Sequence, residues 1–393
     1  MRIEARWRAL ALLFAVRAAM AFQFQTVGAL SPLFAERYGV GLAEIGVLIG
    51  LYVAPGIVFA APGGALAGRF GDRRIVLLAL GLMAAGGALA LVAPTWELAL
   101  AARLIAGTGG VIVNVVLSKM AADWFAGREI ATAMAVFVNS WPVGIAAALS
   151  VLPLVAGAGG LGAALGLSLG FVVLGFGLIL LRHRPAPRAP GAAAPAAFPR
   201  GRALAVTLMA ASIWGLYNGG FSMVFSFGPA LLAERGFALA AASGATSLSI
   251  WALCIAAPLS GLVADRTGRR DLMTAFGLLL FALGLLAARA GAPPALAFAL
   301  IGVAAGIPAG TVMAMPAAAL RPETRAAGMG LFYAIFYALS LAAPAIGGAA
   351  AEAAGTAAAS FDAGALMILA CLPILLAARL TLRAKGAPSA PGA

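Results

Sequence analysis

Long apolar runs recur along the whole chain, and short breaks rich in Gly, Pro, Arg or acidic residues separate them. A helix of about 20 residues crosses the roughly 30 Å hydrocarbon layer of a membrane. No stretch alternates apolar and polar residues with a period of two, as a strand of a membrane barrel would. The pattern therefore predicts an all-α polytopic membrane protein with twelve transmembrane helices. They are expected at residues 9–31, 43–66, 75–94, 97–118, 130–153, 160–181, 203–229, 239–263, 272–290, 294–317, 327–350 and 363–382.

The composition excludes a water-soluble globular protein. Apolar residues make up 63% of the 393 residues and charged residues only 10%, with a mean hydropathy of +1.05. Soluble domains average about 45–50% apolar and about 25% charged residues, so one core could not hide this excess. The two cysteines, Cys254 and Cys371, lie inside apolar runs. They indicate buried thiols rather than a disulfide framework or a thiolate metal site.

The 26 basic residues indicate which side of the membrane each loop faces. Most lie in the terminal segments and in alternate loops, which the positive-inside rule assigns to the cytoplasm. Only Arg37, Arg235 and Arg289 fall in the opposite loops, while Arg17 and Arg103 lie inside predicted helices. We therefore expect an integral protein of a bacterial-type cytoplasmic (inner) membrane, with both termini cytoplasmic. The net charge of +13 is spread over these loops and does not predict nucleic-acid binding.

Residues 182–202 form the longest predicted cytoplasmic break, and their Pro-rich, basic composition is typical of an extended linker. It divides the chain into residues 1–181 and 203–393, each expected to form a six-helix bundle. The loop after the second predicted helix, GALAGRFGDRR from Gly64, matches the loop after the eighth, GLVADRTGRRD from Gly261. The match predicts a duplicated six-helix unit, an arrangement that encloses a central cavity in membrane proteins.

Through these loops the chain resembles the major facilitator superfamily of secondary transporters. The family signature between helices 2 and 3 is matched closely in the second copy. The matching residues there are Gly261, Ala264, Asp265, Arg266, Gly268, Arg269 and Arg270. In the first copy Gly68 stands where the family usually has an acidic residue, and Asp72 stands where an arginine is usual. A second signature, in helix 4, is matched in part by Arg103, Gly107 and Gly110.

The resemblance implies twelve helices in two pseudo-symmetric six-helix bundles, and two loops that act as a conformational latch rather than as a binding site. The family's acidic residue in the first copy helps to hold the outward-facing state, so Gly68 leaves this role open unless Asp72 takes it. Simple positively charged turns are the alternative. The expected latch residues are Gly64, Arg69, Gly71, Asp72 and Arg73 in the first copy, and Gly261, Asp265, Arg266, Gly268, Arg269 and Arg270 in the second.

Two arginines inside predicted helices are the candidates for substrate chemistry. Arg17 lies roughly 10 Å into the first helix, at 1.5 Å per residue, and Arg103 lies comparably deep in the fourth. No Asp or Glu lies deep in any predicted helix. Guanidinium groups without carboxylate partners predict a positive cavity and an anionic substrate. Two alternatives stay open: Arg17 snorkels to the interface, and Arg103 bonds carbonyls of a neighbouring helix.

Further polar and aromatic residues at mid-helix depth complete the expected substrate site. Gln25 is preferred to Gln23 because it lies nearer the helix face of Arg17. Tyr333 and Tyr337 share a helix face, although such pairs are often only packing contacts. The remaining candidates are Asn114, Asn139, Trp141, Tyr217, Asn218 and Trp251.

The sequence thus predicts a secondary transporter that moves a small organic or inorganic anion by alternating access. An efflux carrier for a neutral or hydrophobic compound and a non-transporting sensor of transporter fold are the alternatives. The only histidine, His183, lies in the basic linker without a metal-ligand or triad partner near it in sequence, so we expect no enzyme, metal or cofactor. The expected partners are the substrate and membrane lipids, and the protein is expected to be a monomer. The first helix, RAAMAFQFQTVGALSPL from Arg17, is loosely similar to cyanate-permease-like members of the superfamily.

Overall fold

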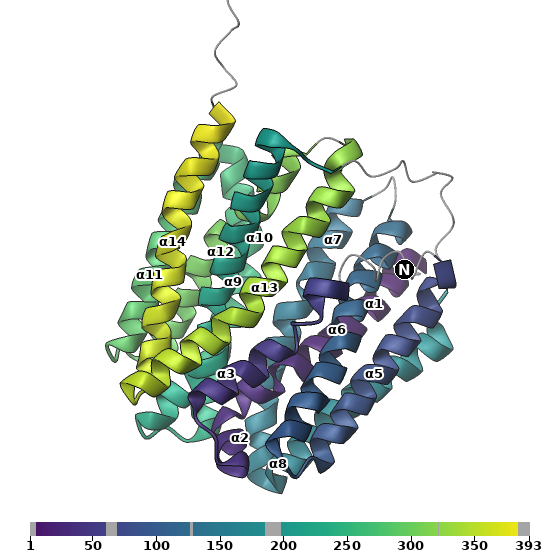
Figure 1. Cartoon of the computed structure of the whole chain (residues 1–393), viewed down its shortest axis with the longest axis vertical. Coiled ribbons are helices and arrows are strands. Elements are labelled where there is room, and N and C mark those ends of the chain that lie inside the picture. Colours follow the sequence, from purple (N-terminus) through teal and green to yellow (C-terminus); the bar gives the residue numbers. More distant parts are fainter. Residues whose placement is uncertain (1–4, 60–68, 126–128, 185–197, 321, 384–393) are drawn as a thin grey trace, which may run out of the picture.

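The computed structural model describes residues 5–59, 69–125, 129–184, 198–320 and 322–383 (Figure 1). Helices form nearly all of these residues, and the described part contains no strand, which confirms the all-α prediction. The helices are α1 (Ala5–Ala29), α2 (Ser31–Tyr38), α3 (Leu42–Leu51), α5 (Asp72–Val92), α6 (Trp96–Trp124), α7 (Ile130–Val138), α8 (Ser140–Arg182), α9 (Gly201–Glu234), α10 (Leu239–Thr267), α11 (Arg270–Arg289), α12 (Pro294–Ala319), α13 (Pro322–Ala354) and α14 (Ala358–Arg383).

The number of membrane crossings agrees with the prediction once α8 is divided. Within the described residues, 11 helical segments are long and apolar enough to span a membrane, and one of them, Val136–Arg182, has 47 residues. A straight helix of that length would extend about 70 Å, more than twice the hydrocarbon thickness. Gly160 interrupts α8 with a φ of 75°. Gly144 and Gly175, one on each arm, both pack against α1 near Val16 and Ala18, so the chain folds back at Gly160 into two crossings.

The duplicated loops show why glycine recurs at matching places in the two halves. Gly71 precedes α5 with a φ of 90°, and Gly268 ends α10 with a φ of 65°. Residues with a side chain rarely adopt this left-handed backbone, whereas glycine does so at no steric cost. The backbone at these two positions therefore has the same conformational demand in both halves, as a duplicated unit requires.

Two bundles of six membrane crossings each result, α1 to α8 and α9 to α14, on the right and the left of Figure 1. They meet mainly where α3 packs on α13, α8 on α10 and α1 on α9. At the first of these contacts the backbones touch: a Cβ on Gly46 would meet the Pro344 carbonyl, and one on Gly348 would meet that of Leu42. The domain boundaries remain a prediction, because most of the linker lies outside the described residues.

Hydrogen bonds between the halves gather toward the end that carries α2. The Ala43 N–H donates to Glu352 Oε2 at 3.2 Å, and Ser243 Oγ donates to the Ala29 carbonyl at 3.3 Å. The N-terminus and the end of α14 lie at the opposite, upper end in Figure 1. Other hydrogen bonds between the halves lie nearer mid-depth, such as the one from Asn114 to Tyr337. The two bundles are thus closed at the α2 end.

Candidate substrate site

Arg17 projects from the middle of α1 into a junction of four helices. Its Nε donates to Asn114 Oδ1 on α6 at 2.8 Å. Its Nη1 lies within 3.0 to 3.2 Å of the Phe137 carbonyl, the Val138 carbonyl and Ser140 Oγ. Because α7 ends at Val138 and α8 begins at Ser140, the last carbonyls of α7 lack helical partners and are available to a cation.

This arginine also connects to the second half of the molecule. Asn114 Nδ2 donates to the Tyr337 hydroxyl on α13 at 3.1 Å, so one hydrogen-bond chain runs from Arg17 across the boundary between the halves. Tyr333 lies one turn earlier on the same helix. The Trp141 ring is 6.0 Å from it. We call Arg17, Asn114, Trp141, Tyr333 and Tyr337 the central cluster.

The central cluster carries a positive charge that no acidic side chain balances. Arg17 is half-buried, and its partners in the described residues are a neutral amide, a hydroxyl, two carbonyls and the faces of Phe137 and Trp141. Its Nη2 has no acceptor among those residues. The ion pairs that the described chain does form lie near helix ends. An anion is the group that such a site lacks.

Arg103 has a different environment and lies further toward the α2 end, beside Gln23 and Phe24 of α1. It is 7% exposed, and its guanidinium donates to the Leu48 carbonyl at 3.0 Å, the Gln23 carbonyl at 3.3 Å and the Phe24 carbonyl at 2.6 Å. It also lies 4.6 Å from the centre of the Tyr52 ring. Arg103 therefore braces α1, α3 and α6 together. The sequence had grouped it with the substrate ligands; these contacts fit the structural alternative instead.

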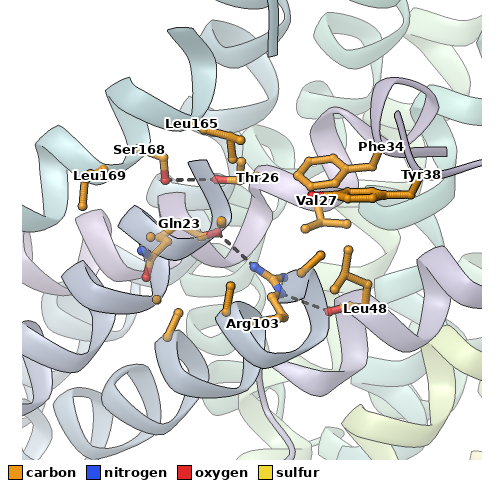
Figure 2. Close-up of a pocket in the computed structure, with 16 residues that line it drawn as sticks. Gln23, Thr26, Val27, Phe34, Tyr38, Leu48, Arg103, Leu165, Ser168 and Leu169 are labelled. Carbon is orange, nitrogen blue, oxygen red and sulfur yellow. Dashed lines mark hydrogen bonds between the residues drawn. The ribbon is translucent and has the colours of Figure 1, made fainter. Parts of the chain in front are cut away.

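A small cavity borders Arg103 inside the first bundle (Figure 2). Its volume is about 40 Å³, and Thr26 and Ser168, whose hydroxyls lie 3.1 Å apart, form part of its wall. A cavity needs only about 10–15 Å³ of such space to hold one water molecule, whereas pockets for organic solutes usually exceed about 300 Å³, so this cavity suits water. It also lies within one half instead of between the two. We therefore place the candidate substrate site at the central cluster.

Several predicted site residues are engaged by the protein itself. Gln25 Nε2 donates to the Phe225 carbonyl of α9, which ties the halves together. The Tyr217 hydroxyl donates to the Ala305 carbonyl at 2.7 Å, and Asn218 Nδ2 bonds a carbonyl of its own helix at 2.7 Å. These residues hold helices in place, and in the described part of the chain none of them contacts the central cluster.

Two further predicted residues have other positions. Asn139 is the residue between α7 and α8, next to the carbonyls that Arg17 contacts. Trp251 on α10 is 40% exposed, and the described residues show no contact between it and the central cluster.

Sequence reasoning missed that the α7–α8 break supplies ligands to Arg17. Ser140 and the carbonyls of Phe137 and Val138 lie in a run that reads as one continuous helix. Pro142 was the available signal, since a proline restrains the backbone before it and removes one helical N–H. Arg17 therefore contacts backbone carbonyls, and such partners cannot be predicted from residue types.

A family model described as the Major Facilitator Superfamily matches residues 13–249 and 211–393. The chain belongs to the major facilitator superfamily. It is thus an integral membrane protein and a secondary transporter, whose substrate is a small molecule. The loose similarity to cyanate-permease-like members remains a prediction.

Two solved structures share the fold of this superfamily member. The crystal structure of an auto-inhibited POT family peptide transporter aligns with a TM-score of 0.70 and 18% identity, over 98% of this chain and 99% of that one. The in meso crystal structure of the POT family transporter PepTSo aligns with a TM-score of 0.73 and 12% identity, over 96% and 98%. At these identities the likeness shows the fold alone. No curated protein matches the chain.

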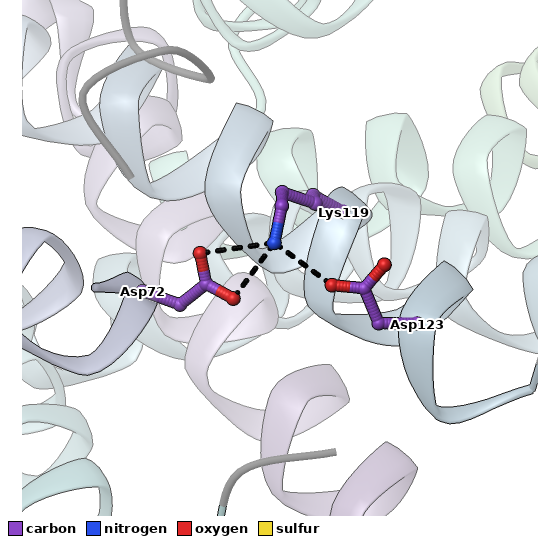
Figure 3. Close-up of polar contacts among 3 residues, drawn as sticks. All are labelled: Asp72, Lys119 and Asp123. Carbon is purple, nitrogen blue, oxygen red and sulfur yellow. Dashed lines mark hydrogen bonds and ion pairs between the residues drawn. The ribbon is translucent and has the colours of Figure 1, made fainter. Parts of the chain in front are cut away.

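In the first latch loop of this superfamily member, Asp72 forms an ion pair (Figure 3). Lys119 Nζ lies 2.9 Å from Asp72 Oδ2 and 2.8 Å from Asp123 Oδ2, so α5 is fastened to α6 within the same half. Arg73 donates to the Leu180 carbonyl at 2.7 Å, and Arg69 is exposed. Gly64 lies outside the described residues.

At the second latch loop, the ion pair between Arg379 and Asp271, at 2.6 Å, joins α14 to the start of α11. The turn at Gly268 is surrounded by the exposed residues Arg266, Arg269 and Arg270. Gly261 lies about two helical turns before Gly268 in α10. The side chain of Asp265 is outside the described set. Whether either loop acts as a latch remains a prediction.

Proposed function

We propose that the chain carries a small organic or inorganic anion across a bacterial-type cytoplasmic membrane by alternating access, with Arg17 as the fixed positive charge that the anion neutralises. The observation that carries this proposal is the environment of Arg17. Its guanidinium lies at mid-depth beside the boundary between the halves, without a carboxylate partner in the described residues. A desolvated cation of this kind is costly to retain unless a ligand balances it.

The hydrogen-bond pattern supports a defined binding step. A planar anion prefers two parallel N–H donors of one guanidinium, here Nε and Nη2. Asn114 Oδ1 occupies the acceptor position on Nε, so the anion replaces a neutral amide rather than a competing carboxylate. The Tyr337 hydroxyl accepts from Asn114 and keeps its own proton to donate to the bound anion.

The closed end of the bundle supports an inward-facing state. If the basic loops face the cytoplasm, as the positive-inside rule expects, both termini are cytoplasmic and the closed α2 end faces outward. Reorientation then requires α3 and α13 to separate at Gly46 and Gly348, where their backbones now touch. We propose that one chain performs this cycle as a monomer, since each half supplies part of the central cluster.

Other solute classes fit the central cluster less well. A neutral or hydrophobic compound would leave Arg17 desolvated and unbalanced. A peptide, the solute named for one of the structural neighbours, carries an amino group that calls for an acidic partner. The described residues place no carboxylate at mid-depth. A sensor of the same fold would bind the anion without moving it.

Uptake into proteoliposomes tests the proposal. The purified full chain is reconstituted and offered labelled carboxylates, inorganic anions, neutral solutes and organic cations in turn. We expect at least one anion to accumulate or exchange and the other classes to stay out. Binding of an anion without movement would support the sensor instead, and movement of only a neutral solute or a cation would overturn the proposal.

A further inference from the structure

A pocket at the basic end of the second half has no role in the central cluster. The α10–α11 turn, the end of α12 and the end of α14 enclose about 430 Å³ there. Arg269, Arg270 and Arg379 line it together with Asp271, Leu272 and Met315. We propose that this pocket binds the phosphate headgroup of an anionic phospholipid. The proposal does not depend on which solute the protein transports.

The charge of the pocket favours a phosphate. Among its described lining residues are three arginines and one acid, so the pocket carries an excess of positive charge. Arg379 Nη2 pairs with Asp271 Oδ1 at 2.6 Å, and Arg379 Nε is buried without an acceptor in the described part of the chain. Arginine donors match phosphate oxygens in geometry as well as charge. The N-terminus of α11, which begins at Arg270, adds backbone N–H groups to the same wall.

The apolar side of the pocket continues into a surface that only lipid would cover. Leu272 lines the pocket and is 64% exposed. Phe276, Leu279 and Leu283 follow at spacings of four and three residues, on the same face of α11, and are also exposed. Because α11 is a membrane-spanning helix, this face meets acyl chains. A phospholipid with its headgroup in the pocket would lay one chain along α11, which a soluble phosphate compound would not do.

The first half offers a contrasting version of the same loop. Asp72 follows Gly71 there, at the position that Arg269 occupies after Gly268. Asp72 and Asp123 together enclose Lys119 (Figure 3), so acidic oxygens already satisfy the cation. In the second loop an arginine, Arg269, stands in the place of this acid, and we expect lipid selectivity there alone.

Native mass spectrometry of the detergent-purified full chain tests the proposal. Phosphatidylglycerol, phosphatidylcholine and glycerol 3-phosphate are titrated separately against the wild type. The variant pair is Arg269→Gln/Arg270→Gln, and the matched control is Arg73→Gln/Arg74→Gln in the first loop, which removes equal charge. Basic residues contribute about 1 kcal/mol each to the binding of anionic lipid, which corresponds to about fivefold per arginine. We expect the first pair to weaken phosphatidylglycerol binding by about 25-fold and the control pair by less than fivefold.

Each remaining result contradicts the proposal in a distinct way. Equal affinity for phosphatidylcholine, whose choline cation balances its phosphate, would show that the net negative charge of the lipid is not required. Equal weakening by the control pair would reduce the effect to general surface charge. Binding of glycerol 3-phosphate as tight as that of phosphatidylglycerol would show a site for soluble phosphate compounds. If the double variant fails to fold, the single exposed substitution Arg269→Gln is used, with an expected loss of about fivefold.

Discussion

Arg17 and Arg103 both lie inside membrane-spanning helices of the same half, yet the structure treats their charges differently. Arg103 is 7% exposed and donates to carbonyls of α1 and α3, so its position depends on the packing of one bundle. Arg17 is half-buried, and through Asn114 it reaches Tyr337 of the other bundle. A cation inside a membrane can therefore serve as a brace when carbonyls surround it, or as a binding group when it keeps donor capacity beside a moving boundary.

Arg17→Gln is expected to cause the largest loss of transport. Glutamine keeps a hydrogen-bonding side chain but removes the charge that balances the anion. A charge-assisted bidentate contact contributes about 1.5–3 kcal/mol, so uptake in proteoliposomes should fall about 100-fold. Uptake is expressed per amount of folded protein in the membrane, because the substitution also removes donors to Asn114 and to two carbonyls. Wild-type kinetics in this variant would contradict the proposed role.

Arg103→Gln is expected to affect stability rather than affinity. The substitution removes donors to three carbonyls on two helices, at a cost of about 2 kcal/mol. A lower melting temperature in detergent and a lower yield from membranes are expected, with an unchanged KM for the protein that remains. A raised KM with normal stability would show that Arg103 binds the substrate, as is proposed for Arg17.

Asn114→Asp should give Arg17 a carboxylate partner and so make its guanidinium less available to the substrate. The new carboxylate would replace the amide oxygen that now lies 2.8 Å from Arg17 Nε and would pair with the guanidinium. We expect anion uptake to fall about tenfold at neutral pH, because the substrate must displace a charged competitor. The double variant Arg17→Gln/Asn114→Asp provides the control: after the loss of Arg17, the aspartate should add little further loss. Additive losses would show that the two residues act independently.

Tyr337→Phe should have the smallest effect of the four. It removes one hydrogen bond between the halves, of about 1 kcal/mol, and one donor to the bound anion. We expect the initial rate of uptake to change by less than about fivefold, with normal protein abundance. Tyr333→Phe is the matched control, because Asn114 makes no hydrogen bond to that hydroxyl in the described chain, and it should change the rate less. The reverse order would move the site one turn along α13.

The twelve crossings could be predicted because their signal is local: apolar length, charged loops and a linker. The same local signal failed at α7 and α8. The run around Asn139 and Ser140 is apolar enough to read as one helix, so the break that gives Arg17 two carbonyl partners was not expected. Conversely, Val136–Arg182 is one helical segment whose reversal at Gly160 the sequence did anticipate as a boundary between two spans.

The candidate site could be predicted only in part. The depth of Arg17 and the absence of acidic residues at mid-helix follow from the sequence. The structural role of Arg103 does not. Arg103 is distinguished by carbonyls of Gln23 and Leu48, and every residue carries a carbonyl. Gln25 shows the same limit, because its helix face favoured the cavity and its amide instead bonds the Phe225 carbonyl in the other half.

The most direct test of the account is a thermal-shift screen of wild type, Arg17→Gln and Arg103→Gln against carboxylates, inorganic anions, neutral solutes and organic cations. The account predicts that at least one anion stabilises the wild type, that Arg17→Gln loses this shift, and that Arg103→Gln melts earlier but keeps the shift. Stabilisation of Arg17→Gln by the same anion, to the same extent as the wild type, would contradict it.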